Sequence, residues 1–122
     1  MHPDLEYVML TPEQIHARVQ EIGRSLTEEY QGREPLLLCI MKGSLVFTAD
    51  LMRTLEVPCT LESISLSSYR AAATLPGDLA LVTPFEVDVN GRDIIVIEDI
   101  LDTGRTLSYV MSLLAAQNPA SL

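Results

Sequence analysis

The chain has 122 residues, of which 48% are hydrophobic, and its formal net charge at pH 7 is −9. This length and apolar content suffice for the core of one domain and argue against disorder. The acidic balance and the single lysine exclude nucleic acid as a general partner, because no basic surface is available to neutralise its phosphates. The sequence has neither an apolar run of about 18 residues nor a signal-peptide pattern, so we expect a cytoplasmic protein that makes no contact with a membrane.

Residues 11–30 predict the first helix. Thr11 is a favourable N-cap residue, and Pro12 suits the first helical turn. Apolar residues then recur at helical spacing, which indicates that one face of the helix packs against the core. The residues on this face are Ile15, Val19, Ile22 and Leu26. The pair Gln31-Gly32 is typical of a helix end.

A strand, a helix and a second strand are predicted next. The continuous apolar run of residues 36–41 indicates a strand that is covered on both faces. Residues 44–55 alternate apolar and polar side chains with a helical period, and we expect Val46 and Phe47 to point toward the core. Residues 59–66 predict the next strand.

The remaining elements complete an α/β pattern. Residues 67–79 have no convincing periodicity and predict a loop, whereas residues 79–86 resume the pattern of a strand. Residues 94–97 form an apolar run, and residues 106–117 predict a helix. Because helices alternate with strands, we expect a single α/β domain over residues 1–122, with a mainly parallel sheet flanked by helices. Ligands bind such sheets at the carboxyl ends of the strands.

Two acids, a polar loop and a helix follow the last strand and mark the candidate site. Glu98 and Asp99 come directly after the apolar run, where they would suit sugar hydroxyls or a divalent cation. The loop that follows offers backbone N–H groups, hydroxyls and a helix start, which suit a dianionic phosphate. It consists of Asp102, Thr103, Gly104, Arg105 and Thr106. We therefore expect a ligand with a phosphate at one end, a diol in the middle and its reaction at the anomeric carbon.

Residues 93–107 closely resemble the phosphoribosyl-pyrophosphate signature of the type I phosphoribosyltransferases, and most of all that of the hypoxanthine-guanine group. Residues 36–44 resemble that group's first strand and its Lys-Gly turn, and residues 67–69 resemble the start of its mobile lid. The three motifs occur in the family's order and spacing, so the resemblance extends from about residue 10 to residue 122. It implies the Rossmann-like core of the type I phosphoribosyltransferases.

The resemblance also implies an activity, a cofactor and a role for each site residue. The activity is transfer of a 5-phosphoribosyl group from phosphoribosyl pyrophosphate to a 6-oxopurine, with release of pyrophosphate, and the cofactor is Mg²⁺. By resemblance, residues 102–106 hold the 5′-phosphate, Asp102 is the catalytic base at purine N7, and Glu98 and Asp99 hold the ribose diol and the metal. The remaining roles are carried by Lys42 and Gly43, which face pyrophosphate, and by Ser68 and Tyr69 in the lid. The family's peptide before the lysine of the turn can be cis.

Two expectations concern the extent of the protein and its assembly. Members of the family continue past the position of Leu122 with further strands and a hood that contacts the purine, so we expect a C-terminally truncated core that lacks these parts. The activity of the short chain is therefore left open. The resemblance implies a homo-oligomer, either a dimer or a tetramer. Two other functions also stay open: a non-catalytic regulator that binds phosphoribosyl pyrophosphate, and a phosphoribosyltransferase for another base.

Overall fold

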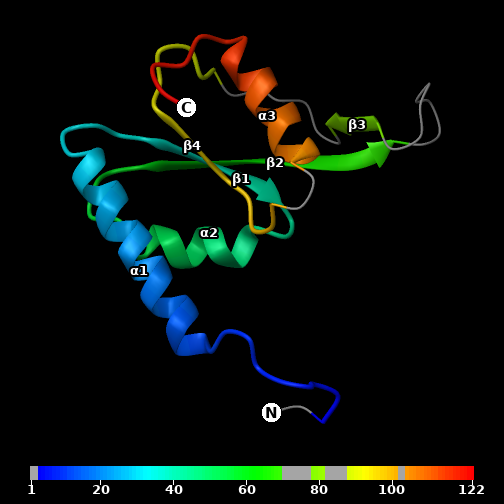
Figure 1. The fold of residues 1–122 in the computed structure, drawn as a ribbon. Coiled ribbons are helices and arrows are strands. Elements are labelled where there is room, and N and C mark those ends of the chain that lie inside the picture. The colour runs from blue at the N-terminus through cyan, green and yellow to red at the C-terminus, as the bar shows by residue number, and fades with distance from the viewer. Residues whose placement is uncertain (1–2, 70–77, 82–87, 102–103) are drawn as a thin grey trace.

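The structure, a computed structural model, describes residues 3–69, 78–81, 88–101 and 104–122 (Figure 1). These residues form helices and strands that alternate in the first half of the chain and are followed by further strands and a last helix. In chain order the elements are α1 (Pro12–Glu29), β1 (Leu36–Met41), α2 (Leu45–Met52), β2 (Thr60–Tyr69), β3 (Asp78–Leu81), β4 (Ile94–Ile97) and α3 (Arg105–Ala115). The predicted α/β pattern is therefore confirmed.

The four strands form one sheet in the order β3-β2-β1-β4. β1 pairs with β2 in parallel from Leu36↔Thr60, and with β4 in parallel from Leu36↔Ile94. β3 alone runs antiparallel, and it pairs with the end of β2. The sheet is thus mainly parallel, as predicted, and β1 lies in its interior with a neighbour on each side.

The sheet separates two layers of helices. α3 lies on one face, and α1 and α2 lie on the other (Figure 1). Alternate residues of β1 point to opposite faces, as the pleat of a strand requires. Leu36, Leu38 and Ile40 pack with Val110 and Leu114 of α3. The residues in the second cluster, on the side of α1 and α2, include Leu37, Leu51, Ile97, Val19, Ile22, Leu26 and Phe47. The apolar run of β1 is continuous because both of its faces are covered.

The first helix begins where the sequence predicts, but the apolar side chain at its start is not buried in the core. The Thr11 hydroxyl accepts a hydrogen bond from the Gln14 N–H, and the Gln14 side chain accepts one from the Thr11 N–H, which completes a capping box. The predictions that Ile15 and Val46 point inward are wrong, since they are 52% and 71% exposed. A helical period locates one face of a helix, but it does not tell how far along that face a neighbour reaches.

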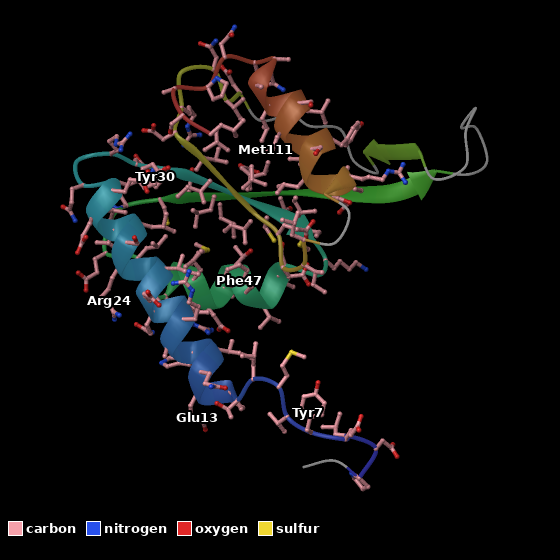
Figure 2. The ribbon with its side chains drawn as sticks, in the orientation of Figure 1. Tyr7, Glu13, Arg24, Tyr30, Phe47 and Met111 are labelled. Carbon is pink, nitrogen blue, oxygen red and sulfur yellow. The ribbon has the colours of Figure 1, made fainter. Side chains whose placement is uncertain are left out.

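Phe47 follows the prediction and packs into the cluster between α2 and the sheet. Figure 2 shows Phe47 in that position, whereas Tyr7 lies on the extended N-terminal segment, away from the sheet. Among the described residues, no helix is both long and apolar enough to cross a membrane.

The second strand is longer than the sequence predicts. β2 continues through Ser68 and Tyr69, where a loop was expected, and these residues pair with Leu79 and Asp78 of β3. The loop boundary at residue 67 was therefore wrong. Consecutive serines give little strand signal in a sequence, but antiparallel pairing satisfies their backbone groups and extends the strand.

Candidate functional site

The candidate site lies at the edge of the sheet where β1 and β4 end. These strands are parallel neighbours in register from Leu36↔Ile94 to Cys39↔Ile97, so the segments that follow them leave the sheet at the same edge. β1 leads into Lys42 and Gly43, and β4 leads into Glu98 and Asp99. The fold thus brings together two segments that are more than fifty residues apart in the sequence.

The two acids are held by backbone donors of their own segment. The Asp99 N–H donates to Glu98 Oε1 over 3.0 Å, and the Ile100 N–H donates to Asp99 Oδ1 over 3.0 Å. Partial burial raises the pKa of Glu98, and a side-chain hydrogen bond with Asp99 and the charge of that carboxylate raise it further. Two adjacent carboxylates are therefore kept close together, with Glu98 half-buried and Asp99 exposed.

This donor set suits a hard cation that the protein shares with a bound ligand. Mg²⁺ in phosphate-handling sites usually takes one or two carboxylates from the protein and completes its shell with water and phosphate oxygens. Glu98 and Asp99 provide two carboxylates, and within the described ranges no group of three or more acidic, histidine or cysteine side chains could enclose a metal. Two carboxylates match the number that such sites commonly take from the protein.

The start of α3 forms the other wall of the site. Its N-cap, Gly104, has φ 81°, in the left-handed region that favours glycine, and it has no side chain to accept hydrogen bonds from the first turn. The N–H groups of a first turn have no partners within their helix, and the helix dipole adds positive potential there. No acidic residue occupies this turn. The arrangement therefore suits an anion.

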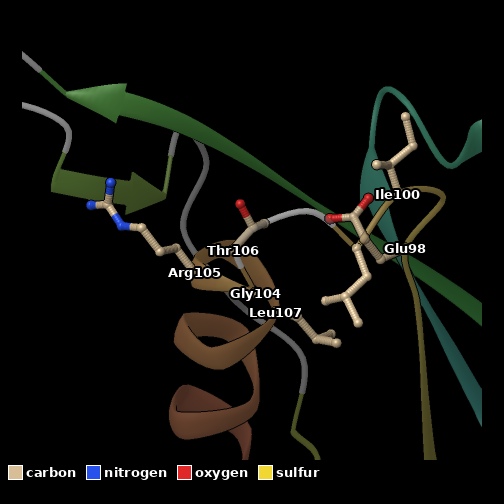
Figure 3. Close-up of a pocket in the computed structure, with 7 residues that line it drawn as sticks. Glu98, Ile100, Gly104, Arg105, Thr106 and Leu107 are labelled. Atoms are coloured by element: carbon tan, nitrogen blue, oxygen red, sulfur yellow. The ribbon is translucent and has the colours of Figure 1, made fainter.

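A small pocket of about 70 Å³ lies between Glu98 and the helix start. Its lining residues are Glu98, Ile100, Leu101, Gly104, Arg105, Thr106 and Leu107 (Figure 3). In this view Arg105 extends away from Glu98. The volume suits one phosphate-sized group and is well below that of a site enclosing a whole small-molecule ligand.

Lys42 and Gly43 approach the acid pair from β1. The Met41–Lys42 peptide is cis, which confirms the expectation drawn from the resemblance. Gly43 lies so close to Asp99 that a Cβ built on it would be 2.9 Å from Asp99 Oδ2. The Lys42 side chain is exposed. The Lys-Gly turn and the acids therefore form one surface.

Not every predicted site residue can be placed. Asp102 and Thr103 lie outside the described residues, and their roles stay predictions. Ser68 and Tyr69 are described only by their backbone, which lies in β2 and not in a loop. Of the predicted phosphate loop, Gly104, Arg105 and Thr106 line the pocket beside Glu98.

Sequence reasoning missed the apolar residues of the pocket. Ile100 and Leu101 are 71% and 70% exposed, although they are large aliphatic side chains, and both line the pocket with Leu107. The available signal was a pair of apolar residues set between acids on a loop, since exposed aliphatic side chains at a polar site commonly contact a ligand.

The sequence matches the model of the phosphoribosyl transferase domain family over residues 10–122. It is 36% identical to the hypoxanthine-guanine phosphoribosyltransferase of Bacillus subtilis over 122 residues, which cover 100% of this chain and 68% of that protein. It is 34% identical to the bifunctional protein TilS/HprT of Listeria monocytogenes, covering 100% of this chain and 19% of that protein.

The fold also matches solved structures. The crystal structure of a hypoxanthine phosphoribosyltransferase from Staphylococcus aureus superposes with a TM-score of 0.88 at 34% sequence identity, covering 100% of this chain and 66% of that one. The chain thus spans about two thirds of the length of the single-function relatives and about a fifth of the bifunctional one.

Proposed function

The chain belongs to the phosphoribosyltransferase family, and we propose that it acts in purine salvage by transferring the 5-phosphoribosyl group of phosphoribosyl pyrophosphate to hypoxanthine or guanine. The observation that carries the proposal is the meeting of three ligand-binding features at one sheet edge. These are the acid pair after β4, the N-terminus of α3 and the Lys-Gly turn after β1. Phosphoribosyl pyrophosphate has one chemical group for each of them.

Each feature suits a different part of this substrate. The helix start at Gly104 and Thr106 suits the 5′-phosphate, because it offers N–H groups and a positive dipole end. Glu98 and Asp99 suit the ribose diol, since carboxylates accept hydrogen bonds from hydroxyls. Lys42 suits the pyrophosphate, because it is exposed at the same edge and carries a positive charge.

The proposed reaction exchanges one bond at the anomeric carbon. The bond from C1 to the pyrophosphate oxygen breaks and pyrophosphate leaves with the electron pair, while purine N9 forms a new bond to C1. The purine loses a proton, for which the candidate acceptor is Asp102 at N7. Residues that line the pocket hold the ribosyl phosphate so that C1 faces the base, which is a contribution of positioning.

Mg²⁺ is part of the proposal, with Glu98 and Asp99 as the residues that would hold it. When bound, it would offset the negative charge of the pyrophosphate in a chain whose net charge is −9. Lys42 in the turn would contribute in the same sense.

Binding of magnesium–phosphoribosyl pyrophosphate to a double variant tests the proposal. The substitution of both Glu98→Ala and Asp99→Ala should weaken binding by at least about tenfold in calorimetric titration, since charge-assisted hydrogen bonds contribute about 1.5–3 kcal/mol each. The matched control is Glu28→Ala with Glu29→Ala, which removes two adjacent exposed acids from α1 and should not change the affinity. Equal affinities of all three proteins would contradict the proposal.

A steady-state assay separates this function from the two others. Turnover with hypoxanthine or guanine supports the transferase, and turnover with adenine or xanthine alone would reassign the base. Tight binding of phosphoribosyl pyrophosphate without turnover on any base would instead favour a regulator.

We further propose that the protein is a cytoplasmic homo-oligomer. The support for self-association is an apolar face formed by Leu10, Ile15 and Val46 in an open groove of about 600 Å³ between α1 and α2, whose lining also includes the charged residues Arg18, Asp50 and Asp99. All three side chains are exposed, and aliphatic residues grouped in this way commonly mark an interface. The cytoplasmic location agrees with two free cysteines, Cys39 and Cys59.

A further inference from the structure

Gly43 lies closer to the Asp99 side chain than any residue with a side chain of its own could lie at position 43. A Cβ built on Gly43 would be 2.9 Å from Asp99 Oδ2, 3.1 Å from Oδ1 and 3.2 Å from Cγ. The whole carboxylate therefore rests against the glycine. No role for this contact follows from the anion and diol assignments above.

The requirement for glycine is one of space and not of backbone conformation. Gly32, Gly91 and Gly104 have positive φ, but Gly43 is not among the residues in that region. Alanine could adopt the backbone conformation of Gly43 without the penalty that a positive φ imposes. The added methyl group would nevertheless overlap the Asp99 carboxylate.

Between the two partners, it is the carboxylate that can move. The backbone around Gly43 is held on both sides, because the Leu45 N–H donates to the Lys42 carbonyl over 3.0 Å and the buried Ser44 hydroxyl donates to the Ile40 carbonyl over 2.6 Å. Asp99 is exposed, and its carboxylate is fixed by the hydrogen bond from the Ile100 N–H at 3.0 Å. Rotation of one short side chain relieves the overlap, at the loss of that hydrogen bond.

We propose that Gly43 is a positioning residue whose absent side chain sets the orientation of the Asp99 carboxylate. It thereby couples the turn after β1 to the acid pair after β4, so that the pyrophosphate end and the diol of one ligand are bound in a fixed relation. The inference rests on the proposed function for the identity of that ligand. Its structural part, the dependence of the Asp99 orientation on Gly43, does not.

The variant Gly43→Ala tests the structural part without any ligand. The amide signal of Ile100 in an NMR spectrum of the purified protein should shift, and its hydrogen exchange should accelerate, because the bond to Asp99 Oδ1 is lost. The midpoint of thermal unfolding should stay close to that of the unmodified protein, since the strain is relieved at an exposed side chain. An unchanged Ile100 amide, or loss of the fold, would overturn the inference.

A double-mutant cycle tests the functional part. Gly43→Ala alone should weaken binding of magnesium–phosphoribosyl pyrophosphate by about tenfold, the loss expected for one charge-assisted contact. In the background of Asp99→Ala it should cost nothing further, because no carboxylate remains to be displaced. An equal loss in both backgrounds would show that Gly43 acts through its own contact with the ligand and would overturn the inference.

The experiments distinguish a failure of the proposed function from a failure of the positioning role of Gly43. If the unmodified protein does not bind phosphoribosyl pyrophosphate, the proposed function fails, and the Ile100 amide still decides the coupling. If it binds and Gly43→Ala binds equally well, the proposed function stands and the positioning role of Gly43 is refuted.

Discussion

At the scale of single residues, Glu98 is more stable in its protonated form than an ordinary glutamate. Partial burial, the side-chain hydrogen bond with Asp99 and the Asp99 charge raise its pKa, while the hydrogen bond from the Asp99 N–H partly opposes them. A carboxyl group with a raised pKa in the folded state stabilises the fold at low pH, and this contribution is lost as the pH rises through that pKa. The ionised form of Glu98, which is the form that suits a cation, therefore lowers the free energy of unfolding of the ligand-free protein at neutral pH.

Replacement of Glu98 with glutamine should show directly that the ionised carboxylate lowers the stability of the fold. Without magnesium, Glu98→Gln should raise the free energy of unfolding at pH 7 by less than about 1 kcal/mol, because the group is largely solvated. The gain should shrink as the pH is lowered, because the raised pKa means that the native carboxyl group takes up its proton at a higher pH than an ordinary glutamate does. Thermal melts from neutral to acidic pH would measure it, with the exposed Glu28→Gln on α1 as the matched control.

At the scale of elements, α1 and α2 pack closely at one glycine. A Cβ on Gly23 of α1 would overlap the hydroxyl oxygen and the Cβ of Thr54, which follows α2. Alanine favours a helix interior over glycine by about 1 kcal/mol, but overpacking costs about 1–3 kcal/mol. Gly23→Ala should therefore lower the free energy of unfolding in urea denaturation.

The effect of Gly23→Ala on the free energy of unfolding should change sign when the Thr54 side chain is removed. In the background of Thr54→Gly, the same Gly23→Ala substitution should stabilise the protein by about 0.5–1 kcal/mol, because only the helical preference remains. A destabilisation of equal size in both backgrounds would mean that the loss does not arise from the contact with Thr54.

The N-terminus of α3 allows a matched pair of glycine variants. Gly104 and Gly91 both have positive φ, 81° and 73°, and neither has an atom that an added Cβ would overlap. Gly104→Ala and Gly91→Ala should each cost about 1–2 kcal/mol of stability, since both place alanine in the left-handed region. Only Gly104→Ala should also weaken binding of phosphoribosyl pyrophosphate, because Gly104 lines the pocket proposed for the phosphate. Calorimetry on both variants decides whether this helix start is the phosphate site.

At the scale of the whole molecule, the apolar face of Leu10, Ile15 and Val46 should determine the assembly state. Val46→Lys places a charge on this face and should shift sedimentation velocity profiles toward the monomer. Ser108→Lys, at an exposed position of α3 on the other side of the sheet, makes the same kind of change and should leave the profile unaltered. A Val46→Lys variant that sediments like the unmodified protein would place the interface elsewhere.

Much of the architecture follows from local sequence patterns, because interactions such as helix capping act between residues that are close in the chain. Thr11 and Pro12 predict the start of α1, and the apolar run of β1 predicts a strand covered on both faces. Gly104, which the sequence places in the polar loop before the last helix, has a positive φ at the start of α3. The two acids after β4 could be located from their spacing alone, since chain order places them at the carboxyl end of a strand.

Other features depend on contacts between segments that are distant in sequence. The continuation of β2 through Tyr69 requires β3 as an antiparallel partner, and the exposure of Val46 depends on how far α1 reaches across α2. The contact of Gly43 with the Asp99 carboxylate arises only when β1 and β4 align as parallel neighbours. The sequence by itself predicted the candidate binding residues, and for the acid pair and the Lys-Gly turn it predicted the edge of the sheet at which they lie. Only the tertiary structure decided which of them touch, because side-chain contacts depend on strand register and helix packing, and neither is encoded within a single segment.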